Sequence, residues 1–286
     1  MEYILLGVVA FTNAVQNILK KKYNEKHSGG TFVFGTISVV AACLLFALLN
    51  RDWTYSASQI GYSLGFAASY CAAVVFSFLA IQSGPLAKTN LIFSCSLLMP
   101  TFYGILFLQE QIKATLIAGI LFLVGAIFLT NYKKTDGHEE PVSLKWIIFV
   151  TLAFFGNGMC ATVQKMETEA FGSSGKNVFM IVALALVTVF MLALTLCSKS
   201  EREGLSDNLK GGWHLALLCG VANGLTNFLI MILNSLLPAS IVFPVISALG
   251  MTLVFIYSVA VIKEKYTPIQ KIGFALGILS VILLNI

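Results

Sequence analysis

Amide side chains recur at a spacing of three, four or seven residues in three apolar stretches of the sequence. The three sets are Asn13, Gln16 and Asn17; Asn157 and Gln164; and Asn223, Asn227 and Asn234. Residues at these spacings share one face of a helix. An amide both donates and accepts hydrogen bonds, so such a face either binds a polar solute or holds neighbouring helices together. Because the sets recur in both halves of the chain, we favour solute binding.

Further polar side chains in the apolar stretches join these candidates. Tyr70 and Asn90 are kept, whereas the serine and threonine residues are set aside because their hydroxyls often bond back to their own helix. Lys88, three residues after Pro85, lies at the predicted start of a helix. Most lysines in that place extend their side chain to the membrane interface.

These polar residues belong to a chain that is otherwise strongly apolar. Of its 286 residues, 58% are hydrophobic and only 11% are charged, and the mean hydropathy is +0.88. A soluble domain has roughly 25% charged residues, so the composition indicates a membrane protein. Ten spanning helices of about 20 residues each would leave no room for a soluble catalytic domain.

Apolar runs bounded by charges, Gly and Pro predict an all-α polytopic membrane protein with ten transmembrane helices. The predicted spans are 3–22, 31–50, 60–82, 86–108, 114–132, 144–166, 176–197, 211–236, 239–262 and 267–286. The six cysteines fall in these runs without a Cys-x-x-Cys pair, so we expect them to pack as small apolar side chains. Neither a cofactor nor a metal site is predicted.

The chain divides into two halves of five helices, residues 1–132 and 144–286, on either side of a polar linker at 133–143. The ends of the halves match at one constant offset, which pairs Glu110, Gly119, Leu129 and Asn131 with Glu264, Gly273, Leu283 and Asn285. A unit with an odd number of crossings places its second copy upside down, so we predict two inverted five-helix repeats around a central cavity. The distribution of Lys and Arg among the connectors also reverses between the halves, as inversion requires.

An acidic turn precedes the last helix of each half, Leu108-Gln109-Glu110-Gln111 and Ile262-Lys263-Glu264-Lys265. With the length and the five-plus-five plan, these turns resemble the ten-helix EamA-like family of the drug/metabolite transporter superfamily. Where that family usually has a glycine before the glutamate, this chain has Gln109 and Lys263. The resemblance implies a carrier whose central cavity is lined by helices 1, 3, 4, 6, 8 and 9. It also implies an anion contact for Lys88, because family members that carry phosphorylated sugars place lysines on these helices.

Charged and catalytic residues are placed away from the middle of the predicted spans. Every Asp, Glu, Lys and Arg lies at or near a predicted span end, so proton antiport through a membrane-embedded glutamate, as in four-helix multidrug relatives, is disfavoured. For Glu110 and Glu264 we expect a structural role at the positive ends of the helices that follow them. An intramembrane enzyme is disfavoured because His27, His138 and His214 fall in connectors or at a span edge.

We therefore predict a secondary transporter, not an enzyme, that moves a small polar or amphipathic metabolite by alternating access. A channel or facilitator for small solutes is the alternative, because inverted repeats also form pores. The expected partners are a small-molecule solute and membrane lipid. Dispersed basic residues do not suggest nucleic acid, and one polypeptide already holds both halves of the cavity, so a monomer suffices.

The expected location is the plasma membrane, and a bacterial inner membrane fits best. The charges of the connectors favour external termini by the positive-inside rule, whereas the family resemblance implies cytoplasmic termini. No motif selects a substrate, a direction of transport or a coupling ion.

Overall fold

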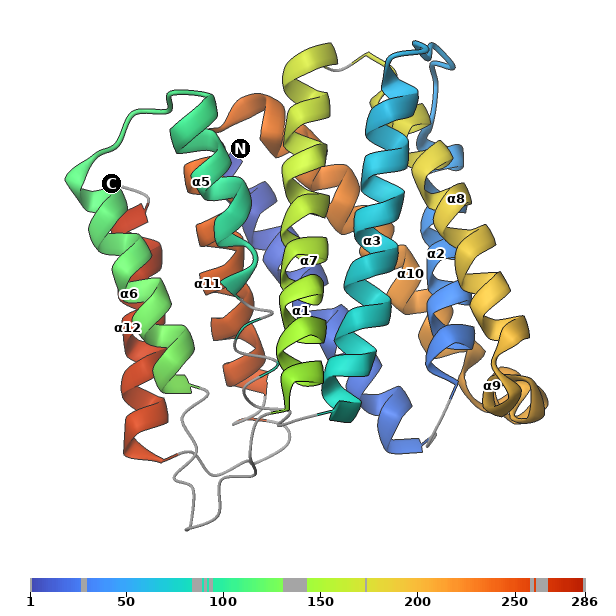
Figure 1. Ribbon diagram of the computed structural model, residues 1–286. Helices are drawn as coiled ribbons and strands as arrows, with labels where there is room; N and C mark the ends of the chain where they lie inside the picture. Colours follow the sequence, from blue (N-terminus) through green and yellow to red (C-terminus); the bar gives the residue numbers. More distant parts are fainter. Residues whose placement is uncertain are drawn as a thin grey trace. The chain divides into compact units, whose positions relative to one another are not determined.

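The computed structural model describes residues 2–26, 30–83, 89, 92, 95–130, 143–172, 174–257, 260 and 267–284. This part of the chain is helical and has no strand (Figure 1). Its helices are α1 (Glu2–Lys26), α2 (Thr31–Leu49), α3 (Gln59–Ser83), α5 (Leu98–Phe107), α6 (Ala114–Thr130), α7 (Leu144–Phe171), α8 (Lys176–Cys197), α9 (Lys199–Glu203), α10 (Leu205–Leu236), α11 (Ala239–Tyr257) and α12 (Pro268–Leu284).

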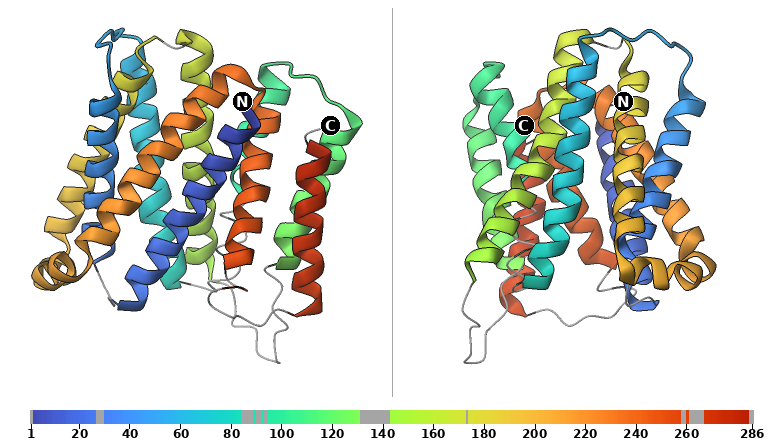
Figure 2. Two further views of the ribbon diagram at one scale, coloured as in Figure 1. Left: turned by 180° about the vertical axis from the view of Figure 1, so that it is seen from behind. Right: turned by 45° about the vertical axis from the view of Figure 1, so that its right-hand side comes forward.

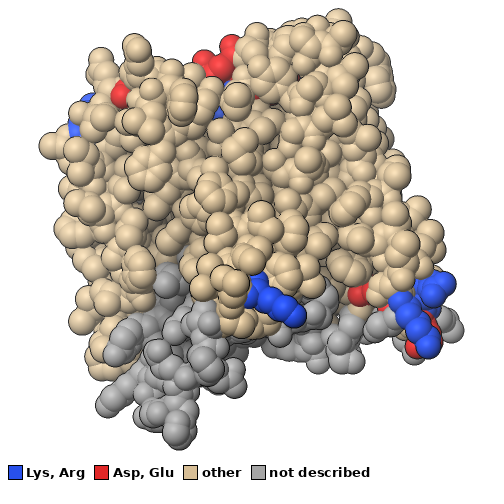
Figure 3. Space-filling model, viewed as in Figure 1, with Lys and Arg blue, Asp and Glu red and all other residues tan. Residues whose placement is uncertain are grey.

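Six described helices, α1, α2, α3, α7, α8 and α10, are long and apolar enough to cross a membrane. The helices α5, α6 and α12 are apolar but shorter, and α11 contains a shorter apolar segment, Ala239–Gly250. In the view of Figure 3, uncharged side chains cover the lengths of the helices and charged side chains gather near their ends. A multi-pass membrane protein requires this distribution, because a charge in contact with hydrocarbon is costly.

Several helix boundaries agree with the spans predicted from hydropathy. The five that agree to within two residues at each end are 31–50, 60–82, 114–132, 176–197 and 267–286. Helix α7 is longer than predicted, because it continues past residue 166 to Phe171. Its extra turn follows Lys165 and contains Glu167. The side chains of both residues are buried. Hydropathy ended this span too early because it treats any charged residue as facing water.

The predicted span 86–108 is interrupted in its described part by a turn at Ser96 and Leu97, just before α5. Pro100 explains the interruption, because proline has no amide hydrogen to donate to the carbonyl of Ser96 four residues earlier. The amide of Met99 donates to that carbonyl instead, at 3.0 Å, which tightens the backbone locally.

The helices form two compact units. Unit 1 consists of Met1–Cys71 and Met166–Leu236, and unit 2 consists of Ala72–Lys165 and Leu237–Ile286. The boundaries between the units fall inside α3 and α7. Each unit thus combines helices from both predicted repeats.

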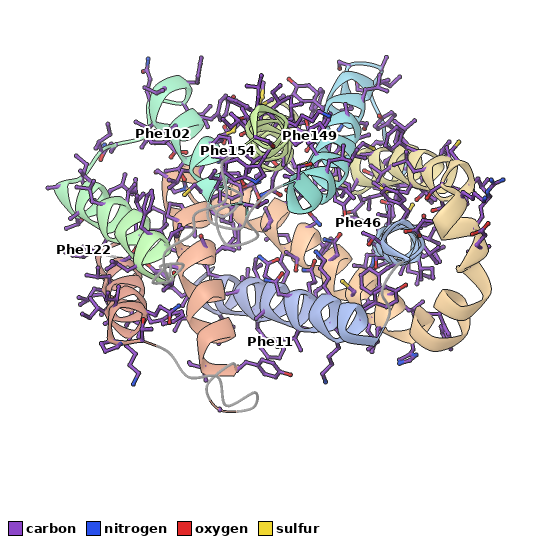
Figure 4. All side chains as sticks on the ribbon, turned by 60° about the horizontal axis from the view of Figure 1, so that its bottom comes forward. Phe11, Phe46, Phe102, Phe122, Phe149 and Phe154 are labelled. Carbon is purple, nitrogen blue, oxygen red and sulfur yellow. The ribbon has the colours of Figure 1, made fainter. Side chains whose placement is uncertain are left out.

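In unit 1, α2 packs against α8 and α10, and α1 packs against α10 (Figures 1 and 2). The helices α2 and α8 are antiparallel, because Thr36 bonds to Thr195 at 3.3 Å and the thiol of Cys43 donates to the carbonyl of Ile181 at 3.7 Å. Phe46 of α2, labelled in Figure 4, is fully buried in this unit.

In unit 2, α6 packs along α12, and α11 packs against α12 and α5. Two glycines permit the close approach of α6 and α12. A Cβ on Gly119 would lie 2.7 Å from Cγ of Leu284, and a Cβ on Gly273 would lie 2.7 Å from the backbone nitrogen of Thr130. Gly119 and Gly273 therefore let α6 and α12 pack closely together.

Candidate functional site

The helices α1 and α10 of unit 1 each have one exposed apolar face and one polar face. On α1, Ile4 is 72% and Phe11 is 59% exposed, and Figure 4 shows Phe11 on the outer side of the helix. Asn13 follows Phe11 by two residues, which is about 200° around the helix. On α10, Asn223 follows the exposed Val221 at the same interval. The amides therefore point away from the apolar faces of both helices.

Gln16 joins the polar faces of the two helices. Its side chain is 4% exposed, and its Nε2 donates to Oγ1 of Thr226 at 2.9 Å and to Oδ1 of Asn13 at 3.3 Å. Its Oε1 accepts from Nδ2 of Asn223 at 3.0 Å. Both ends of this buried amide thus have partners, as burial requires.

The hydrogen bonds continue along α10. Nδ2 of Asn227 donates to Oδ1 of Asn223 at 3.2 Å and to the Asn223 carbonyl at 2.9 Å. Asn227, Asn223, Gln16 and Asn13 therefore form one chain in which each amide donates to the next. Four of the side chains predicted as site residues are brought together in this amide chain.

Two hydroxyls that the sequence analysis set aside complete the contact. Oγ1 of Thr12 lies 2.7 Å from Oγ1 of Thr226, and Thr226 also donates to the carbonyl of Ala222 at 2.8 Å. Thr226 thus bonds back to its own helix, as such residues often do, while its oxygen still accepts from Gln16. The sequence spacing could have indicated the role of Thr12, because Thr12 lies one helical turn before Gln16 on the same face.

Asn13 and Asn17 form the open edge of this polar face. Asn13 is half-buried and uses its oxygen to accept from Gln16, but its Nδ2 has no partner among the described residues. Asn17, one turn further along the same face, is exposed and has no hydrogen-bond partner in the described part of the chain. In a membrane, such amides are tolerated only where they face water or a solute.

Tyr70 lies on α3, outside the amide chain. Its half-buried ring stacks on Phe66, with centroids 6.0 Å apart, and Phe66 in turn packs edge-on against Phe179 of α8. The aromatic part of Tyr70 thus packs on Phe66 of the same helix, and Phe66 links it to α8.

The remaining predicted site residues belong to unit 2. Nδ2 of Asn157 donates to Oγ of Ser96 at 2.6 Å, which ties α7 to the turn before α5. Gly158 allows this contact, because a Cβ there would lie 2.8 Å from the Ser96 carbonyl. Gln164 is buried within α7. The predicted residues Lys88 and Asn90, like Glu264, lie outside the described residues.

Glu110 has a structural role, but at a different helix from the one predicted. Its Oε1 accepts from the amide of Ala239 at 2.8 Å and its Oε2 from the amide of Ser240 at 2.9 Å, so it caps the start of α11. The expectation that it serves the following helix, α6, was wrong. Gly104 provides the space, because a Cβ there would lie 2.5 Å from Oε2 of Glu110.

The residue before Glu110 explains the glycine that is usual in this turn. Gln109 has φ 53° and is the one described residue other than glycine with positive φ. Glycine adopts this left-handed conformation without steric cost, whereas a side chain is strained there. A glycine at residue 109, as in the family that this turn resembles, would adopt this conformation without strain.

Sequence analysis also missed the burial of two charged residues on α7. Nζ of Lys165 donates to the carbonyl of Leu237 at 3.4 Å, just after the end of α10. Oε1 of Glu167 accepts from Nε2 of Gln59 at 3.0 Å. The sequence analysis had predicted only that these charges lie at or near a span end.

Comparison with known proteins gives one family. The model of the EamA-like transporter family matches residues 1–132 and 144–286. The chain belongs to the EamA-like transporter family. This is a family of membrane transporters of the drug/metabolite type, so the predicted resemblance is confirmed.

A solved structure is similar in fold to this EamA-like protein. It is a crystal structure of a protein with a TM-score of 0.75 and 9% sequence identity, and the match covers 99% of this chain and 95% of the other. At this identity the likeness concerns the fold alone. Comparison with curated proteins gives no match.

The chemistry of the polar face in this EamA-like protein is hydrogen bonding. In the described part of the chain, His, Cys, Asp and Glu residues form no group that could hold a metal ion. The six cysteines are all free thiols. Amides and hydroxyls arranged in this way orient a polar molecule without changing its covalent structure.

Proposed function

We propose that the chain is a secondary carrier that binds a small polar or amphipathic metabolite on the amide face of α1 and α10 and moves it by alternating access. The observation that carries this proposal is the open edge of that face. Asn13 and Asn17 present amides with unused hydrogen-bonding capacity directly away from the apolar face of α1. Because the chain belongs to a transporter family, we interpret this polar face within the membrane as a solute-binding face.

The arrangement supports a solute with oxygen acceptors. Nδ2 of Asn13 is a donor whose orientation is set by the bond between Oδ1 of Asn13 and Gln16. A carbonyl, hydroxyl or carboxylate oxygen on the solute is its natural partner. Lys20, exposed one turn beyond Asn17, adds a cation at the end of the same face and extends the proposal to solutes that carry an anionic group.

The helix pairing within the units supports two inverted repeats. In unit 1, α2 packs against α8, and these are the second spans of the two predicted repeats. In unit 2, α6 packs along α12 and α5 against α11, which pairs the fifth spans and the fourth spans. Helices at equivalent repeat positions meet in this way when a two-fold axis relates the repeats. Such a pseudo-two-fold arrangement is the usual basis of alternating access.

We further propose that a monomer in a plasma membrane, in particular a bacterial inner membrane, performs this transport. Tyr70, Lys88, Asn90, Asn157 and Gln164 remain proposed contributors to the solute path. Of these, Asn157 and Gln164 correspond to the amides of α1 in the second predicted repeat.

The proposal is tested by a thermal-shift screen of the detergent-purified protein against amino acids, nucleosides, sugars, phosphorylated sugars and organic cations. A ligand that binds only the folded state raises its stability. Solutes that raise the melting temperature are then assayed for counterflow in proteoliposomes. Saturable exchange supports a carrier. Flux that persists without exchange and does not saturate supports a channel, and binding with no flux contradicts transport of that solute.

A further inference from the structure

Glu167 is the most deeply buried carboxylate in the described part of the chain. Its side chain is 0% exposed, and it lies on α7 four residues before the helix ends at Phe171. This last turn of α7 belongs to unit 1. The proposed solute-binding face does not use it, so its burial needs a separate explanation.

Only one oxygen of Glu167 is hydrogen-bonded. Oε1 accepts from Nε2 of Gln59 at 3.0 Å, and the same nitrogen donates to the carbonyl of Ser174 at 3.1 Å. Oε1 of Gln59 accepts from the amide of Ser56 at 2.9 Å. Gln59 therefore has no donor left, and Oε2 of Glu167 is buried with no hydrogen-bond partner among the described residues.

The other enclosed carboxylates show how unusual this is. Both oxygens of Glu110 accept from backbone amides, and Oε2 of Glu201 accepts from the amide of Val33 at 3.2 Å. An ionised carboxylate that is buried with an unsatisfied oxygen costs several kcal/mol. If Glu167 served only to hold Gln59, one acceptor oxygen would suffice, and the buried negative charge would lower the stability of the fold without any benefit.

The charged and titratable groups around this end of unit 1 do not remove that cost. Lys176, the first residue of α8, attracts the Glu167 carboxylate electrostatically, and its Nζ lies 5.9 Å from the ring centroid of Phe228. The other groups at this end are exposed or half-buried: Arg51, Asp52 and Tyr55 before α3, Tyr62 on α3, and Glu169 on α7. None of these bonds to Oε2 of Glu167.

A second buried acceptor lies at the same end of the unit. Oδ1 of Asn177, on the first turn of α8, is buried and has no hydrogen-bond partner in the part of the chain that the structure describes. Asn177 lies three residues after Ser174. The carbonyl of Ser174 and Oε1 of Glu167 accept from the same nitrogen, Nε2 of Gln59. Oε2 of Glu167 has no partner among the described residues and Gln59 has no unused donor, which indicates that the missing partner of this carboxylate is a positively charged species.

We propose that Glu167 binds a proton that crosses the membrane with the solute, so that the proton gradient drives the carrier proposed above. A proton on Oε2 forms one O–H bond, removes the buried charge and converts the unsatisfied oxygen into a donor. Hard metal cations take about six oxygen ligands, whereas Glu167 offers one, so a proton fits this site better. The proton comes from water on one side and returns to water on the other. Because Glu167 is enclosed in this conformation, each transfer requires the site to open.

The first test uses the proton itself as the probe and needs no solute. Infrared spectra of the detergent-purified protein are recorded across a pH titration, because a protonated buried carboxyl absorbs apart from a carboxylate. We expect a protonated-carboxyl band that titrates in the wild type, disappears in Glu167→Gln and persists in Glu169→Gln. The Glu169 variant is a matched control, two residues away on the same helix but exposed. A band that Glu167→Gln leaves unchanged, or no titrating band in the wild type, overturns the proposal.

The second test separates this proposal from the carrier function on which it rests. Proteoliposomes are loaded with a solute that the thermal-shift screen identifies, and counterflow is compared with accumulation driven by a pH gradient. We expect Glu167→Gln to keep counterflow and lose accumulation at least tenfold. If it keeps both activities, or if both it and Glu167→Asp lose both, Glu167 is not the coupling site. Absence of counterflow in the wild type contradicts the carrier function instead.

Discussion

The side-chain amide of Gln16 on α1 donates to the hydroxyl of Thr226 on α10 at 2.9 Å, across 210 residues of sequence. Both side chains are buried, so neither atom has water as an alternative partner. The same amide donates to Asn13 and accepts from Asn223. One residue therefore holds two helices together and also sets the orientation of the Asn13 amide, which we propose faces the solute. A preformed binding group loses less entropy when a ligand arrives.

Removing the Thr226 hydroxyl should weaken this helix contact. We expect Thr226→Val, which keeps the shape of the side chain, to lower the free energy of unfolding by about 1–3 kcal/mol, because it leaves the donor of buried Gln16 without its acceptor. Thr226→Ser keeps an acceptor oxygen and should lose less than half as much. Melting temperatures in one detergent measure the difference. Equal stability of Thr226→Val and wild type would show that the contact contributes nothing.

The cap that Glu110 forms on α11 should depend on the absence of a side chain at residue 104. Glu110→Ala removes two charge-assisted hydrogen bonds and should destabilise the protein by about 1.5–3 kcal/mol. Gly104→Ala places a Cβ against the carboxylate and should displace it from the amides of Ala239 and Ser240.

A double-mutant cycle checks this dependence. In the Glu110→Ala background, Gly104→Ala should cost little further stability, because the carboxylate that it displaces is already absent. If the two stability losses simply add, the glycine does not act through Glu110.

Relieving the positive φ of Gln109 should stabilise the protein. A non-glycine residue in the left-handed region costs about 1–2 kcal/mol of stability. Replacing it with glycine removes this cost, but it also raises the conformational entropy of the unfolded chain, which offsets part of the stabilisation. We expect Gln109→Gly to raise the free energy of unfolding by about 0.5–1 kcal/mol. Gln111→Gly, two residues later and without positive φ, should be neutral or destabilising. A lower melting temperature for Gln109→Gly than for Gln111→Gly would contradict this explanation.

Local sequence patterns predicted the polar faces of α1 and α10 because helical periodicity determines which residues share a side. Asn13 and Gln16, and likewise Asn223 and Asn227, contact one another as their spacing indicates. The pairing of α1 with α10 did not follow from the pattern, because it depends on tertiary packing between segments far apart in the chain. For the same reason Thr226 was set aside, since its own helix supplied a sufficient partner.

Other features depend on interactions that hydropathy does not represent. The end of α7 was placed at 166 because Lys165 and Glu167 are charged, yet both are enclosed by protein. Glu110 was assigned to the nearest helix, although the geometry of the turn directs its carboxylate to a helix 129 residues away in sequence. The turn before α5 could have been predicted from Pro100, which removes one hydrogen bond of the helix.

Counterflow in proteoliposomes with the Asn13→Ala variant tests the central claim, that the amide face of α1 and α10 binds the transported solute. We expect Asn13→Ala to reduce uptake at least tenfold, and Asn227→Ala to reduce it similarly by disrupting the amide chain, while expression and melting temperature change little. Phe11→Ala, on the opposite face of α1, is the matched control and should transport at the wild-type rate. Unchanged uptake in both asparagine variants, at equal amounts of folded protein, would remove this face from the solute path.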